Sequence, residues 1–277
     1  MSTPLRYPAA GAQRAVVIGA GVGGLAAAVD LANAGLQVTV VERAPCPGGK
    51  LRTVQVGDAH LDAGPTVFTM RDAFERLFAD AGERLSDHLS LQPVERLARH
   101  AWTDGSALDL YADTERSAEA IGEFAGAAEA RRFRTFCRRA AEIHDTLDTT
   151  FMRAQRTSPI GLVHRVGYRN LGAMLRISPF TTLWQALGRY FHDTRLQQLY
   201  GRYATYCGSS PFRAPATLML IAHVEGQGVW EIEGGMHRLA QALGGRVLLA
   251  GGRGRLDEVD QEFLRGVGVD RVGGGGL

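Results

Sequence analysis

Short hydrophobic runs and turn residues alternate near the start of the chain. The run at 15–18 is β-branched and is followed by glycine, which predicts a buried parallel strand. An alanine-rich segment at 25–34 stops at Gly35 and predicts a helix, and a second β-branched run at 37–41 predicts a second strand. This order of strand, helix and strand indicates an α/β fold with a parallel sheet.

The later part of the chain shows a different pattern. The segment that begins FERLFADAG predicts an amphipathic helix, and a hairpin is predicted around Asp104 and Gly105. The segment GGRVLLAGG, residues 244–252, predicts the beginning of another strand. Hydrophobic periodicity then fades, and 11 of the 34 residues in 244–277 are glycine.

The glycines between the first strand and the helix satisfy the spacing G-x-G-x-x-G at Gly19, Gly21 and Gly24, with Gly23 in addition. The first glycine permits a tight turn, the second lets the backbone approach a pyrophosphate, and the third lets helix pack on strand. Glu42 follows the second strand, where a carboxylate can accept hydrogen bonds from a ribose and disfavours a 2′-phosphate. The sequence therefore predicts a dinucleotide site, in which we include the neighbouring Arg43.

A second glycine pair follows at a fixed distance. The spacing E-x5-GG-x3-T, which starts at Glu42 and contains Gly48 and Gly49, resembles the extended fingerprint of the flavin amine oxidase and phytoene desaturase superfamily. The resemblance implies FAD as the cofactor, with the second glycine pair lying against it. Lys50 and Arg52 would then contact the cofactor, and the alternative is that both are solvated loop cations.

Three further segments narrow the resemblance. Asp62 to Pro65 looks like the D-x-G-P segment of carotenoid desaturases, which adds Gly64 and Pro65 to the cofactor site. The step from Leu91 to Pro93 and the segment 229–243, VWEIEGGMHRLAQAL, are also similar to these enzymes. Over residues 14–243 the chain most resembles the hydroxycarotenoid 3,4-desaturases, or methoxyneurosporene dehydrogenases, of photosynthetic bacteria.

That resemblance implies both an architecture and a reaction. The fold would be a Rossmann-like FAD-binding domain with a partial, mainly helical substrate domain. The reaction would be the FAD-dependent C-3,4 desaturation of a hydroxy- or methoxyneurosporene-type carotenoid, in which hydride passes to the flavin. No catalytic residue is assigned. No metal site is predicted, because the histidines form neither an H-E-x-x-H motif nor another close ligand pair.

The charge and composition of the chain indicate which kinds of partner to expect. The net charge of +2 gives no support to a nucleic-acid partner, and three widely spaced cysteines fit a reducing compartment. Residues 151–213 hold nine arginines, one acid and many aromatic side chains. This mixture predicts peripheral contact with the inner or an intracytoplasmic membrane from the cytoplasmic side, and the alternative is an ordinary helical core with solvated arginines.

The predicted organisation has five segments. They are an extension at 1–13, the first part of the FAD domain at 14–93, a partial substrate and membrane-associating domain at 94–230, a return to the FAD domain at 231–243, and an aberrant tail at 244–277. We attribute the tail to a frameshift or premature stop and expect the chain, as given, to bind flavin poorly. The alternatives are another flavin oxidoreductase, such as an amine oxidase, or a catalytically inactive fragment.

Overall fold

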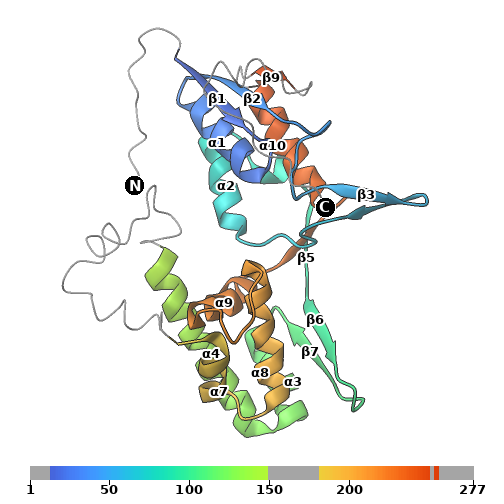
Figure 1. Ribbon diagram of the computed structural model, residues 1–277, viewed down its shortest axis with the longest axis vertical. Helices are drawn as coiled ribbons and strands as arrows, with labels where there is room; N and C mark the ends of the chain where they lie inside the picture. Colours follow the sequence, from blue (N-terminus) through green and yellow to red (C-terminus); the bar gives the residue numbers. More distant parts are fainter. Residues whose placement is uncertain (1–12, 149–180, 250–252, 256–277) are drawn as a thin grey trace, which may run out of the picture. The chain divides into compact units, whose positions relative to one another are not determined.

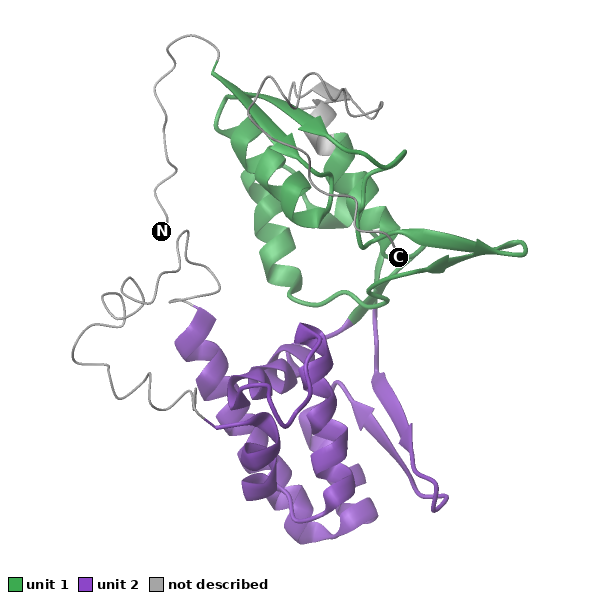
Figure 2. Ribbon diagram, viewed as in Figure 1, with its two compact units in different colours: residues 1–92, 230–277 green, residues 93–229 purple. Residues whose placement is uncertain are grey.

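Two compact units make up the protein. The computed structural model describes residues 13–148, 181–249 and 253–255. Unit 1 consists of residues 1–92 and 230–277, and unit 2 of residues 93–229 (Figure 2). The predicted boundaries lie after residues 93 and 230, and the roles given to the segments stay predictions. Parts of the predicted extension, membrane-associating segment and tail lie outside the described residues, namely 1–12, 149–180, 250–252 and 256–277.

The strand, helix and strand predicted at the start of the chain are present in unit 1. They are β1 (Arg14–Ile18), α1 (Val22–Asn33) and β2 (Gln37–Val41). β1 and β2 pair in parallel, and β2 also pairs in parallel with β9 (Arg253–Arg255), which gives the sheet order β1-β2-β9 (Figure 1). This arrangement confirms the predicted α/β fold.

Helix α10 (His237–Leu249) corrects one prediction. The segment 244–252 does not begin a strand, because the helix continues through its two first glycines to Leu249. Leu239, Ala240 and Leu243 are buried at helical spacing, and α10 packs on α1, so packing outweighs the local preference of the glycines. The strand of this region is β9, which follows the helix.

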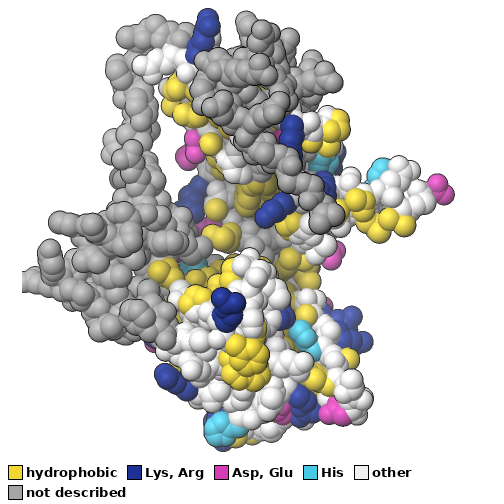
Figure 3. Space-filling view, in the orientation of Figure 1, with side chains coloured by type: hydrophobic (Ala, Val, Ile, Leu, Met, Phe, Trp, Pro, Cys, Tyr) yellow, Lys and Arg dark blue, Asp and Glu magenta, His cyan; other side chains and the backbone are white. Residues whose placement is uncertain are grey.

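The rest of unit 1 consists of short elements around this sheet. They are β3 (Thr53–Val56), β4 (Ala59–Asp62), α2 (Arg71–Asp80), η1 (Leu85–Asp87), β5 (Leu91–Pro93) and β8 (Trp230–Ile232). α2 is the predicted amphipathic helix, and it buries Phe78. The β3–β4 hairpin extends from unit 1 and carries hydrophobic side chains at its surface (Figure 3).

Unit 2 is mainly helical, as the resemblance implies. Its hairpin consists of β6 (Arg96–Ala101) and β7 (Ala107–Tyr111), and its helices are α3 (Thr114–Ala125), α4 (Ala127–Leu147), α7 (Leu183–Tyr190), α8 (Thr194–Gly201), η4 (Arg202–Cys207), η5 (Ala216–Met219) and α9 (Leu220–Gly226). The hairpin turn lies at the predicted position, where Gly105 has a φ of 83° and Asp104 accepts a hydrogen bond from the Ser106 N–H. The predicted hairpin is therefore confirmed.

Aromatic side chains form the centre of unit 2. Phe136 is fully buried, and its ring centroid lies 4.8 Å from that of Tyr200 and 5.2 Å from that of Phe191. Burial raises the pKa of Tyr200 well above its usual value and raises the pKa of the nearby Cys137 thiol to about 12. Several aromatic residues of the predicted membrane-associating segment therefore belong to the core instead.

Candidate functional site

The turn between β1 and α1 depends on two of the predicted glycines. Gly19 has a φ of 97°, and its N–H donates to the Val41 carbonyl at 2.7 Å. A Cβ on Gly24 would lie 2.0 Å from the Gly19 carbonyl oxygen, much closer than van der Waals contact allows. Only glycine at this position lets α1 begin so close to the end of β1.

The N-terminus of α1 is open. Gly21 precedes the helix in an extended conformation, no side chain caps the helix through a hydrogen bond, and its first turn contains no acidic residue. Within the described part of the chain, a Cβ built on Gly21 or on Gly23 meets no heavy atom within 4 Å. Free amides and a partial positive charge therefore face unfilled space, which suits an anionic group such as a pyrophosphate.

The second glycine pair lies against the first loop. The N–H of Gly48 donates to the Ala20 carbonyl at 2.8 Å, and Gly48 forms a parallel bridge with Gly21. A Cβ on Gly49 would lie 3.2 Å from the Cα of Gly21. Both glycines of the pair have positive φ values, 129° and 58°. The fold thus brings together the two glycine clusters that the sequence separates.

Glu42 is held beside the same loop. Its Oε2 accepts a hydrogen bond from the Ala20 N–H at 2.6 Å, and its Oε1 accepts one from the Ala44 N–H at 2.9 Å. These two bonds fix the carboxylate just beyond the carboxyl end of β2. Each oxygen keeps a second lone pair, which can accept a hydrogen bond from a ribose hydroxyl.

Residues distant in sequence also contact the segment that follows the second glycine pair. The Nδ1 of His237 lies 2.8 Å from the Leu51 carbonyl, and a Cβ on Gly64 would lie 1.9 Å from the Lys50 carbonyl oxygen. Asp62 Oδ2 accepts a hydrogen bond from the Met236 N–H at 3.0 Å. The segments around Asp62 and around Met236 both stand out in the sequence, but their contact does not, because no local pattern indicates a contact between residues so far apart.

Four predicted site residues have exposed side chains. Arg43, Lys50, Arg52 and Pro65 lie at the surface of unit 1. Among the residues that the structure describes, none forms an ion pair with the three cations. Their contact with a cofactor stays a prediction, and so does the alternative that Lys50 and Arg52 are solvated.

The residues present fit one half of a dinucleotide. The unfilled space beside Gly21, the uncapped amides of α1 and the anchored carboxylate of Glu42 match a pyrophosphate and an adenosine ribose in the order that the sequence predicts. These groups therefore suit the adenosine diphosphate part of FAD.

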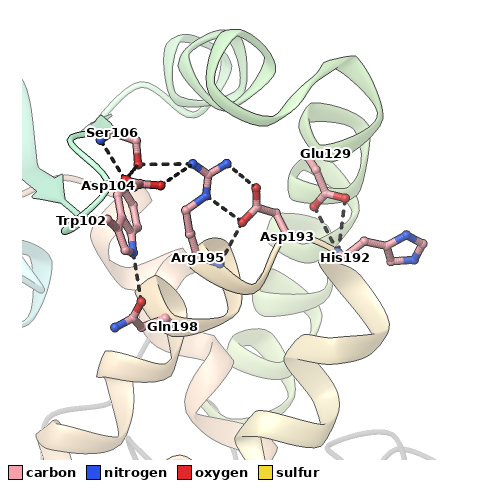
Figure 4. Close-up of polar contacts among 8 residues, drawn as sticks. All are labelled: Trp102, Asp104, Ser106, Glu129, His192, Asp193, Arg195 and Gln198. Carbon is pink, nitrogen blue, oxygen red and sulfur yellow. Dashed lines mark hydrogen bonds and ion pairs between the residues drawn. The ribbon is translucent and has the colours of Figure 1, made fainter.

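Unit 2 contains a polar network of another kind (Figure 4). Arg195, at the start of α8, binds the Asp193 carboxylate at 2.7 Å, donates to Ser106 Oγ at 3.2 Å and lies 3.7 Å from Asp104. Trp102 donates from Nε1 to Gln198 Oε1 at 2.9 Å. All these groups pair with one another, so the network fastens the β6–β7 hairpin to α8 and offers no obvious reactive group.

A group of three potential metal ligands also forms in unit 2. His144 and Asp145 on α4 and His223 on α9 offer ligand atoms that all lie within 4.8 Å of one another. The sequence predicts no metal site because His144 and His223 are far apart along the chain.

Comparison with known proteins identifies desaturases as relatives. The chain is 50% identical to hydroxyneurosporene desaturase from Rubrivivax gelatinosus over 279 aligned positions, which are 99% of this chain and 52% of the relative. It is 48% identical to hydroxyneurosporene desaturase from Cereibacter sphaeroides over 83% of this chain and 46% of the relative. It is 38% identical to phytoene dehydrogenase from Streptomyces griseus over 82% of this chain and 44% of the relative. The predicted resemblance is confirmed, and the chain spans about half the length of these curated relatives.

Solved structures share the fold. Putrescine oxidase bound to putrescine matches with a TM-score of 0.52 and 17% identity, over 87% of this chain and 50% of that one. An oxidoreductase from Methanosarcina mazei matches with a TM-score of 0.52 and 16% identity, over 88% of this chain and 51% of that one. The family described as flavin containing amine oxidoreductase matches residues 22–259, which confirms FAD as the cofactor type. With most of its residues inside that match, the chain belongs to the flavin-containing amine oxidoreductase family.

Proposed function

We propose that this protein acts in the FAD-dependent desaturation of a hydroxy- or methoxyneurosporene-type carotenoid at C-3,4. The observation that carries the proposal is the 50% identity to a hydroxyneurosporene desaturase over nearly the whole chain. The two glycine loops of unit 1, at 19–24 and 48–49, together with Glu42 form what we call the cradle. This cradle supports the proposal, because the reaction needs a bound flavin. The amine oxidase alternative is less favoured, because the likeness to putrescine oxidase rests on 17% identity.

This chain contributes the binding of one end of the cofactor. FAD, when bound, supplies the acceptor for the hydride that leaves the carotenoid. The amides at the start of α1 would hold the pyrophosphate, and Glu42 would hold the adenosine ribose. Gly48 and Gly49 keep the second loop close enough to cover the cofactor, and Arg43, Lys50 and Arg52 would add positive charge around its phosphates.

Flavin titration tests the cofactor site. A Gly21→Val side chain would occupy the unfilled space at the start of α1, so we expect FAD affinity to fall at least about a hundredfold while the fold is kept. Glu42→Ala removes the ribose acceptor and should weaken FAD binding by about tenfold. Unchanged quenching of flavin fluorescence by both variants would show that this loop does not bind FAD.

Pigment analysis tests the reaction. Cells that accumulate hydroxyneurosporene would express this chain alone, or followed by the unmatched part of the Rubrivivax gelatinosus relative. We expect the joined protein to convert the pigment into one with a longer conjugated system and a red-shifted absorption. Hydrogen peroxide release with amines and no change of pigment would contradict the proposal in favour of an amine oxidase.

Peripheral membrane contact is the second part of the proposal. In the described part of 151–213, Tyr206 and Phe212 are 62% and 61% exposed, and the ring of Phe212 lies 4.9 Å from that of Trp184. Arg189 and Arg213 are exposed in the same segments, and hydrophobic and basic side chains lie side by side on the visible face of unit 2 (Figure 3). This combination suits the headgroup region of an anionic bilayer. No described helix is both long and apolar enough to cross a bilayer.

Sedimentation with vesicles tests the membrane contact. We expect the protein to bind anionic vesicles more than neutral ones, and a Tyr206→Ser, Phe212→Ser variant to bind less. Equal recovery with both vesicle types, or no change in the variant, would contradict the proposal.

A further inference from the structure

Three side chains with metal-binding atoms meet where the last turns of α4 lie against α9. His144 and Asp145 belong to α4, and His223 belongs to α9. Their potential ligand atoms all lie within 4.8 Å of one another, and this is the single such group of three among residues 13–148, 181–249 and 253–255. The group is part of unit 2, whereas the cofactor cradle belongs to unit 1.

The two imidazoles are close without stacking face to face. Their ring centroids lie 4.7 Å apart, and their planes are inclined by 51°. His144 Nδ1 lies 3.4 Å from Asp145 Oδ1, and His223 Nε2 lies 3.0 Å from the side-chain amide nitrogen of Gln227. A histidine that binds a metal through one ring nitrogen carries a proton on the other, so on metal binding the Gln227 amide would turn to place its oxygen, which can accept a hydrogen bond, against His223 Nε2.

The kinds of donor determine which ions fit. Two imidazoles and one carboxylate suit zinc and similar divalent transition metals, whereas magnesium and calcium prefer oxygen ligands only. Bond lengths of about 2.0–2.1 Å to a tetrahedral ion require donor atoms about 3.3 Å apart, so these groups must approach by about 1.5 Å at most. Asp145 can make this movement easily, because its side chain is 77% exposed.

We propose that His144, Asp145 and His223 form a binding site for a divalent transition-metal ion such as Zn²⁺, with water completing the coordination. His144 is only 8% exposed, so the ion would have protein on one side and solvent on the other. Because the ligands come from two helices, the bound ion would tie the end of α4 to α9. It would stabilise the folded form of unit 2 in proportion to the occupancy of the site.

The test uses the whole chain without flavin and without an affinity tag, because histidine tags bind metals. Competition with a zinc indicator should give one Zn²⁺ per chain. Replacement of zinc by Co²⁺ should give visible bands of nitrogen and oxygen ligation without thiolate charge transfer, which separates this site from binding by the cysteines. Zinc should also raise the unfolding temperature of the parent protein.

Matched variants decide the outcome. We expect His223→Gln to weaken zinc binding by about a hundredfold and Asp145→Asn by about tenfold. His60→Gln removes an exposed histidine of β4 and should leave the affinity unchanged. If the parent binds no stoichiometric zinc at micromolar concentrations, or if Asp145→Asn and His223→Gln bind as tightly as the parent, the proposal is wrong. Asp145 is exposed, so its variant keeps the test decisive even if His223→Gln fails to fold.

Discussion

The candidate site of unit 1 is built from glycines and backbone groups, whereas the core of unit 2 is built from large side chains. In unit 1 the cradle consists of glycines and backbone groups, and Gly24 and Gly64 allow no Cβ at all. In unit 2 the centre consists of large aromatic rings around Phe136, and a small pocket lined in part by Phe133, Tyr200 and Tyr203 has a volume of about 30 Å³. Unit 1 thus leaves backbone groups at the start of α1 available to a ligand, whereas the centre of unit 2 is filled by its own side chains.

This contrast predicts different responses to substitution. The glycine loops of unit 1 are sensitive to an added carbon wherever a backbone carbonyl oxygen lies against the glycine, as at Gly24 and Gly64. A core made of rings is sensitive to removed atoms, because close-packed neighbours collapse only partly into a cavity.

The largest expected effect comes from Phe136→Ala. Removal of a fully buried ring should lower the free energy of unfolding of unit 2 by about 3–5 kcal/mol. Phe212→Ala, at an exposed position of the same unit, should change it by less than about 1 kcal/mol. Denaturant unfolding followed by tryptophan fluorescence measures both. Equal losses in the two variants would show that the ring cluster does not dominate the stability of unit 2.

In unit 1 the addition of one carbon should be the costly change. Gly24→Ala would place a Cβ against the Gly19 carbonyl and should destabilise unit 1 by about 2–4 kcal/mol. Gly23→Ala, one position earlier in the same helix, meets no atom and should be neutral or stabilising by up to about 1 kcal/mol. Hydrogen exchange of the α1 amides distinguishes the two, and a similar response of both would argue against the steric explanation.

A smaller effect is expected in the polar network of unit 2. Arg195 also lies over the ring of Phe124, with its guanidinium carbon 4.1 Å from the ring centroid. Arg195→Ala should lower the free energy of unfolding by about 1–2 kcal/mol, because an ion pair, a hydrogen bond and a cation–π contact are lost together. Arg76→Ala removes only an exposed pair with Asp72 on α2 and should cost at most about 0.5 kcal/mol. Thermal unfolding measures the loss of stability in both variants. A larger loss in Arg76→Ala than in Arg195→Ala would show that the polar network does not stabilise unit 2.

The smallest effect on the free energy of unfolding is expected from Asp109→Asn, and only at acidic pH. Hydrogen bonds from Arg99, with a further one from Arg96, lower the pKa of Asp109 from 3.8 to about 2. A folded-state pKa below the unfolded value stabilises the protein above pH 4, and this stabilisation is lost as the pH falls from about 4 to about 2. In Asp109→Asn the acid transition should therefore be shallower in this interval. A pH titration of stability that is the same in parent and variant would show that the pair does not persist in solution.

The sequence predicted what depends on neighbours along the chain. Glycine spacing around Gly21 and the position of Glu42 after a strand are local patterns, so the cradle of unit 1 was recognisable before the fold was known. The contact between Asp62 and Met236 and that between His144 and His223 depend on packing between distant segments, and no local pattern indicates them. The strand predicted at 244–252 was wrong for a related reason, because the packing of α10 on α1 outweighed the local preference of two glycines.

The placement of β9 has a consequence for how the chain acquires its structure during synthesis. β2 is the central strand of its sheet, and one of its two edges pairs with β9. β9 leaves the ribosome only after all of unit 2 has been made. At roughly 5–20 residues per second, β2 and α1 wait on the order of ten seconds or more for their last partners. Unit 2 is continuous in sequence, so it can fold while unit 1 is still incomplete. The segment encoded first is therefore finished last, and during that interval the exposed edge of β2 is the part of the nascent chain that most needs a chaperone.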